Sequence, residues 1–172
     1  TGHFSESWAV QTEALGGRVV RTPYAEGFPI DAGAVEQALR ADIGHEIVAV
    51  FAVHTDTASS LTSDLRALRA AIDAAGHPAL FVVDVVASLG AAPFAMDALG
   101  ANVVIGASQK GLMVPPGLGF VAIDGVAMAV ARRNPAPRFY WDWERRSSDL
   151  VYRKFCGTPP QSLLMGLEAA LS

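Results

Sequence analysis

Cysteine and lysine are both scarce in this sequence of 172 residues. The single cysteine, Cys156, excludes an internal disulfide, argues against a cysteine-based metal site and favours a reducing, cytoplasmic setting. The net charge is −4 and no basic run is longer than a pair. This argues against a nucleic-acid partner, because such binding depends on many Lys and Arg contacts to phosphate. With only two lysines, Lys110 and Lys154, the position of each is informative.

Long uninterrupted hydrophobic runs are also missing, although 51% of the residues are hydrophobic and only 17% are charged. The longest apolar stretch, GHPALFVVDVVASLGAAPFAM, is interrupted by Asp84, Gly90 and Pro93. It predicts a buried strand and loop rather than a membrane span. We therefore expect a folded domain with a sizeable core and no membrane partner.

The sequence does contain an alternation of apolar, strand-like runs and amphipathic helical patterns. The predicted strands are Arg18–Thr22, Ile47–Val53, Leu80–Val83, Val103–Ile105 and Leu118–Ile123. The predicted helices are Glu6–Leu15, one capped by Asp31, one from Ser63 or Asp64 to Ala75, and Val126–Arg133. This alternation predicts an α/β fold, in which helices cover both faces of a mostly parallel sheet.

Polar residues follow three of these predicted strands. The stretch HTDTASS follows Ile47–Val53, Asp84 follows Leu80–Val83, and GASQK follows Val103–Ile105. In open α/β sheets, ligands bind just beyond the carboxyl ends of the strands. We therefore expect a ligand site at this edge of the sheet.

Lys110 and Asp84 indicate which kind of ligand this edge of the sheet would bind. A strand-end Asp most often caps a loop or helix, and a loop lysine is often simply solvated. Lys110, however, lies among glycine, proline and apolar residues in GASQKGLMVPPGLGF, where burial would favour an uncharged, nucleophilic amine. A lysine, an acid and hydroxyls at successive strand ends suggest pyridoxal phosphate, which needs an amine and an acidic partner for its ring nitrogen.

Other kinds of site have less support. Ser108, His54 and Asp84 could form a hydrolase triad, but no G-x-S-x-G turn accompanies them. The spacing of polar residues after His54 does not form a metal site. Neither a G-x-G-x-x-G fingerprint nor a P-loop is present in the sequence. The stretch RFYWDWERRSSD is a surface contact segment or a border of the substrate entrance, where Arg145 and Arg146 could bind a carboxylate.

The motifs VHTDTASS, FVVDVVASLGAAPFAMDALGANVVIGASQKGLMVPPGLGFVAI and TPPQSLLMGLEAAL occur in this order. This order resembles the class V, fold type I aminotransferases, and within them the serine–pyruvate/alanine–glyoxylate group. The resemblance implies pyridoxal 5'-phosphate as cofactor and transamination between a small amino acid and a 2-oxo acid such as pyruvate or glyoxylate. It also implies a homodimer with shared active sites.

The same resemblance implies that residues 1–172 are the central part of the cofactor-binding large domain. The phosphate-binding segment of the family would precede Thr1, and the small C-terminal domain with its carboxylate-binding arginine would follow Ser172.

The resemblance implies roles for individual residues. Lys110 would form the Schiff base and move the substrate proton, while Asp84 would pair with the pyridine nitrogen. Val86 and Phe4 would pack on opposite faces of the cofactor ring.

Three further residues would contact the cofactor's polar groups. Thr57 would reach the phenolate oxygen and Gln109 the phosphate, while Thr158 would reach the phosphate in the neighbouring subunit. The sequence departs from the family pattern at Asp56, where Glu is usual, and at Ser60, where Gly is common.

Two alternatives remain within the same fold. Cysteine desulfurases and related lyases usually carry histidine where this sequence has Gln109 and Phe4, which favours transamination. A non-catalytic domain that has lost the cofactor is the second alternative, and the joint presence of Asp84, Gln109 and Lys110 argues against it.

Overall fold

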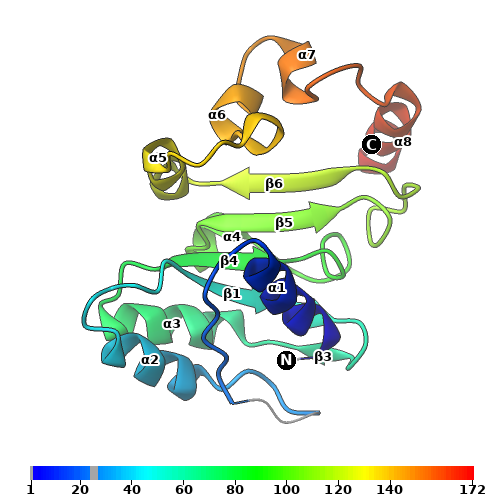
Figure 1. The fold of residues 1–172 in the computed structure, drawn as a ribbon. Helices are drawn as coiled ribbons and strands as arrows, with labels where there is room; N and C mark the ends of the chain where they lie inside the picture. The colour runs from blue at the N-terminus through cyan, green and yellow to red at the C-terminus, as the bar shows by residue number, and fades with distance from the viewer. Residues whose placement is uncertain (1, 24–26) are drawn as a thin grey trace.

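A four-stranded sheet in the order β1-β4-β5-β6 forms the centre of the molecule (Figure 1). The computed structural model describes residues 2–23 and 27–172. The strands are β1 (Ala49–Val53), β4 (Leu80–Asp84), β5 (Val103–Ala107) and β6 (Gly119–Ile123). The first three are parallel and β6 runs antiparallel to β5, which confirms a mostly parallel sheet.

Helices precede and follow these strands. They are α1 (His3–Ala14), α2 (Ala32–Ala41), α3 (Leu65–Ala75), α4 (Met96–Leu99), α5 (Gly125–Arg133), α6 (Trp143–Arg146), α7 (Val151–Lys154) and α8 (Gln161–Leu171), with a 3-10 turn η1 (Phe139–Trp141). Asp31, Asp64 and Asp124 accept backbone N–H groups at the starts of α2, α3 and α5. These caps satisfy donors that a helix start leaves free, which explains why the helices begin there.

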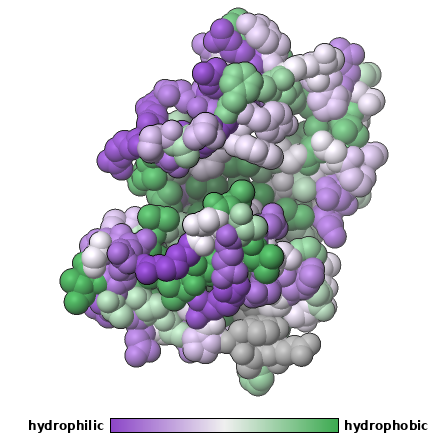
Figure 2. Space-filling view, in the orientation of Figure 1, coloured by the Kyte–Doolittle hydropathy of each residue, from purple (hydrophilic) through white to green (hydrophobic). Residues whose placement is uncertain are grey.

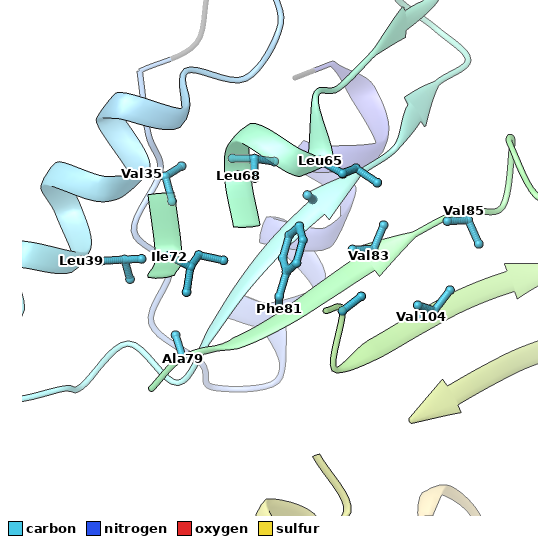
Figure 3. Packing of buried hydrophobic residues seen from close by; sticks show 12 residues of the cluster. Val35, Leu39, Leu65, Leu68, Ile72, Ala79, Phe81, Val83, Val85 and Val104 are labelled. Carbon is cyan, nitrogen blue, oxygen red and sulfur yellow. The ribbon is translucent and has the colours of Figure 1, made fainter. Parts of the chain in front are cut away.

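The main core lies between α2, α3 and one face of the sheet (Figure 3). Leu68 and Ile72 of α3 pack there with Phe81 and Val83 of β4, and all four are 1% exposed or less. Alternate residues of β4 face opposite ways, so Val82 joins a second cluster on the other face with Val103 and Ala127. Burial on both faces is what the continuous apolar runs predict.

The second face is only partly covered by the described residues. α1 contacts β1 there, and α5 packs its Ala127 on the sheet. Figure 2 shows hydrophobic surface gathered in a hollow between α1 and the elements above β6. Large apolar residues such as Phe51 and Val121 are about half exposed on these strands.

The predicted strand Arg18–Thr22 is wrong, because this segment is not part of any sheet. A strand requires a neighbouring strand for its backbone hydrogen bonds, and none of the described strands pairs with this segment. Side chains hold it instead, with Arg18 paired to Glu46 and Arg21 paired to carboxylates of α1. The structure also contains a short hairpin that was not predicted, β2 (Thr55–Asp56) with β3 (Leu61–Thr62). No helix in the described ranges is long and apolar enough to cross a membrane.

Candidate active site

Asp84 is the last residue of β4, and two donors hold its carboxylate. Oδ1 accepts the backbone N–H of Val86 at 2.8 Å, and Oδ2 accepts the indole N–H of Trp8 at 2.9 Å. The residue is half-buried and lies in register between Val53 of β1 and Ile105 of β5. The arrangement gives a carboxylate of fixed orientation at the carboxyl edge of the sheet.

Lys110 lies in the turn that follows the next strand, β5. This turn is anchored by Ser108, whose buried hydroxyl donates to the carbonyl of Pro115 at 2.9 Å. The backbone N–H of Met113 donates to the carbonyl of Lys110 at 2.9 Å. Gln109 and Lys110 themselves are exposed. The predicted burial of the Lys110 amine is therefore wrong for this chain, because the described residues leave its side of the turn open.

The loops that carry Asp84 and Lys110 touch at two glycines. A Cβ atom on Gly111 would overlap the carbonyl oxygen of Leu89, and a Cβ atom on Gly90 would lie 3.1 Å from the carbonyl carbon of Gly111. Gly90 also has φ +77°, a left-handed conformation that favours glycine. This close approach joins the turn of Lys110 to the loop that begins at Asp84.

Asp56 joins the start of α1 to the turn that contains Thr57. Its carboxylate is 1% exposed and accepts the backbone N–H groups of Phe4 at 2.9 Å, Ala58 at 2.9 Å and Ser59 at 3.0 Å. Burial raises the pKa of Asp56, but these N–H groups lower it more, so its net pKa lies below the ordinary value. The site thus gains a second strand-end carboxylate that is fully bonded and structural.

Gly2 allows Asp56 to approach α1 closely. Its φ is +98°, and a Cβ atom at this position would lie 2.6 Å from the Cγ of Asp56. The result is that Phe4 and Thr57, both exposed, come from segments bonded to one buried carboxylate. The structure therefore brings these two predicted residues into neighbouring segments.

Comparisons with known proteins identify the family of this chain. The family model described as Aminotransferase class-V matches residues 1–172. The chain belongs to this family. It is 43% identical to a serine–glyoxylate aminotransferase of Methylorubrum extorquens, over 99% of the chain and 44% of that protein. It is 40% identical to an L-aspartate–glyoxylate aminotransferase of Paracoccus denitrificans, over 98% of the chain and 43% of that protein.

Solved structures agree on the fold. An aspartate aminotransferase from Thermus thermophilus superposes with a TM-score of 0.80 at 29% identity, and covers 99% of this chain and 46% of that one. An alanine–glyoxylate aminotransferase from Nostoc sp. gives a TM-score of 0.85 at 23% identity, with 99% and 45% coverage. The resemblance seen in the sequence motifs is confirmed, and the chain spans less than half the length of these relatives.

The remaining predicted residues of this class V chain lie in different surroundings. Val86 is half-buried and donates its backbone N–H to Asp84, so it lies next to the carboxylate. Thr158 is exposed in the turn before α8, whose Leu163 packs against Gly117 in the loop after Lys110. Its role toward a neighbouring subunit stays a prediction.

Ser108, His54 and Asp84 do not form a hydrolase triad. The Nδ1 of His54 bonds the hydroxyl of Ser88 at 2.8 Å, whereas the hydroxyl of Ser108 donates to a backbone carbonyl. His54 and Ser88 are both buried, and the backbone N–H of His54 donates to the carbonyl of Asp84 at 2.9 Å. His54 is therefore a packed histidine that fixes the β1 end beside the β4 end.

Trp8 is the residue of this site that sequence reasoning missed. It is 76 positions from Asp84, and no motif marks it. The only available signal is its spacing from Phe4, because residues four apart on a helix lie on the same face. The aromatic stretch near Arg145 lies elsewhere: Phe139, Trp143 and Arg145 line a hollow of about 440 Å³ beside α5. Because β6 runs antiparallel to β5, α5 follows β6 at the edge of the sheet opposite the end of β5 (Figure 1).

Acid is expected to destabilise the protein through His54. Burial lowers the pKa of His54 below its ordinary 6.5, so the unfolded chain takes up this proton before the folded one does. Stability that is fully present above pH 6.5 is lost as the pH falls from that value toward the folded pKa. Thermal midpoints measured between about pH 8 and 5 should fall on the acid side in the native protein and fall less in His54→Gln. Equal slopes in both proteins would contradict this assignment.

Proposed function

We propose that the protein containing this chain binds pyridoxal 5'-phosphate and transfers an amino group from a small amino acid to a 2-oxo acid. The observation that carries the proposal is the placement of Asp84 and Lys110 on adjoining loops at the carboxyl edge of the sheet. Ligands of open α/β sheets bind at this edge. The family membership of the whole chain supports the same conclusion.

The residues present fit this cofactor. Asp84 is an ionisable acceptor, and its two donors leave further lone pairs for a protonated ring nitrogen. Lys110 is exposed, and no carboxylate among the described residues forms an ion pair with it. Its amine is therefore available for a covalent bond. Phe4 and Thr57 are exposed on neighbouring segments, where a ring and its phenolate oxygen could be contacted.

Each residue has a distinct task in this proposal. Lys110 holds the cofactor covalently and then moves the proton at the substrate Cα. Asp84 keeps a proton on the ring nitrogen by its negative charge. Val86 and Phe4 pack on the ring faces, while Gln109 binds the phosphate together with Thr158 of a second subunit. The bound cofactor supplies an electron-accepting ring that stabilises the charge left at the substrate Cα.

Glyoxylate is the proposed acceptor. Both curated relatives described above are named for transamination with glyoxylate, one from serine and the other from aspartate. We therefore propose a homodimeric, cytoplasmic enzyme that uses glyoxylate and one of these donors, with alanine as a further candidate. Sedimentation of the holoprotein at twice the mass of one chain would support the dimer.

A donor panel tests the function. The complete reading frame is expressed, loaded with pyridoxal phosphate and mixed with serine, alanine or aspartate, with and without glyoxylate. We expect an absorption band near the visible edge that a productive donor bleaches, and that glyoxylate restores as glycine forms. A protein that takes up no cofactor, or whose band responds to none of these donors, would contradict the proposal. Release of sulfide from cysteine would favour the desulfurase alternative instead.

A further inference from the structure

Trp8 makes a polar contact that the family motifs do not explain. Its indole N–H donates to the Oδ2 of Asp84 at 2.9 Å, from a helix that is far from β4 in the sequence. Trp8 is half-buried, and its ring tilts against Phe51 of β1, with centroids 5.5 Å apart and planes at 35°. It therefore approaches Asp84 as a packed side chain rather than as a mobile surface group.

Hydrogen bonds hold α1 in the position from which Trp8 reaches Asp84. The buried Asp56 accepts the backbone N–H of Phe4 at 2.9 Å in the first turn of the helix. Trp8 lies one turn later on the same face of α1, because residues four apart are neighbours on a helix. The hydroxyl of Thr12 donates to the carbonyl of Trp8 at 2.8 Å, which adds a bond within the helix. One helix face thus presents Phe4 and Trp8 to the strand ends.

Two hydrogen-bond donors are required to fix the terminal torsion of the Asp84 side chain. The terminal torsion of an aspartate side chain is broad and roughly two-fold, so a single hydrogen bond leaves it loosely defined. The backbone N–H of Val86 holds Oδ1, and the indole N–H of Trp8 holds Oδ2. An indole nitrogen can donate a hydrogen bond but cannot accept one. In this contact Trp8 is therefore always the donor and the carboxylate of Asp84 the acceptor.

We propose that Trp8 is a positioning residue for the cofactor: its indole N–H fixes the plane of the Asp84 carboxylate so that the carboxylate faces the cofactor's ring nitrogen. The inference rests on the proposed function. Trp8 acts through Asp84 and touches neither the substrate nor the reacting carbon. Loss of the N–H should therefore weaken cofactor binding and turnover while leaving the affinity for the amino donor unchanged.

Trp8→Phe in the complete holoprotein tests this, because it keeps an aromatic ring against Phe51 and removes only the donor. The matched control is Trp141→Phe, at a tryptophan that is 74% exposed and lies in η1. We expect Trp8→Phe to bind pyridoxal phosphate about tenfold more weakly and to lose about tenfold in kcat. The KM for the amino donor and the thermal midpoint of the cofactor-free protein should match those of the control.

A second variant guards against a packing defect. Incorporation of 3-benzothienylalanine at position 8 replaces the indole N–H by sulfur and keeps the two-ring shape. The proposal requires the same losses in this variant. Unchanged cofactor affinity and kcat in it would overturn the role of Trp8, as would a raised donor KM or a lowered thermal midpoint of equal size. If native protein and Trp141→Phe also failed to bind cofactor, the proposed function itself would fail.

Discussion

Lys110→Ala is expected to abolish transamination, with a loss in kcat of about 10⁴-fold or more. In the proposed function, the variant removes both the amine that would hold the cofactor and the base that would move the substrate proton. Only one other lysine is present in this chain, Lys154. Steady-state rates of glycine formation from glyoxylate measure the effect.

Lys154→Ala is the matched control for this variant. Lys154 is exposed at the end of α7 and follows no strand of the sheet. Its replacement should leave kcat and the absorption band unchanged. If Lys110→Ala kept most of the native rate, or if Lys154→Ala lost it, Lys110 would not be the catalytic amine.

Asp84→Asn is expected to lower kcat by about a hundredfold or more while the protein stays folded. The amide oxygen can still accept a hydrogen bond from Trp8 or Val86, so one of the two contacts that orient the side chain at position 84 is kept. The amide carries no negative charge, however, and it cannot hold a proton on the ring nitrogen by electrostatic attraction. The electron-accepting character of the ring would then fall, and proton removal from the substrate would slow.

Asp97→Asn provides the comparison for Asp84→Asn. Asp97 is exposed in α4 and its replacement changes the net charge by the same amount. Measurements of kcat and of the donor KM should show a loss in kcat for Asp84→Asn alone. Near-native turnover of Asp84→Asn would contradict the assignment of Asp84 to the ring nitrogen.

The strands and their polar ends could be predicted from the sequence because burial leaves a local pattern. Leu80–Val83 and Val103–Ile105 are continuous apolar runs, and the structure places both within parallel strands. Because β4 and β5 are parallel, their carboxyl ends lie at one edge of the sheet, and the segments of Asp84 and Lys110 are placed there without further information. The capping aspartates likewise predict helix starts from nearby residues alone.

Contacts between distant segments could not be predicted in this way. The bond from Trp8 to Asp84 depends on where α1 settles, and that in turn depends on Asp56 and on the space left at Gly2. Arg18–Thr22 has the β-branched composition of a strand, but its state depends on whether a neighbouring strand exists. Local composition therefore predicts neither the contact of Trp8 with Asp84 nor the missing partner strand of Arg18–Thr22.

The exposure of Lys110 shows a second limit. Its neighbours in sequence are small and apolar, which is compatible with a buried turn, yet the described residues leave the side chain open. Ser60 is similar: it adopts φ +58°, a conformation that favours glycine, and the turn keeps it although the residue type disfavours it. In both cases the backbone path, which is fixed by Ser108 and by Asp56, determines the outcome.

Chemical capture of the bound cofactor tests the central claim most directly. The holoprotein is reduced with borohydride, digested, and its peptides are mapped by mass spectrometry. The account predicts that the reduced cofactor stays attached to the peptide that contains Lys110, through its side-chain nitrogen. Attachment at Lys154, at any other side chain or at none would contradict it.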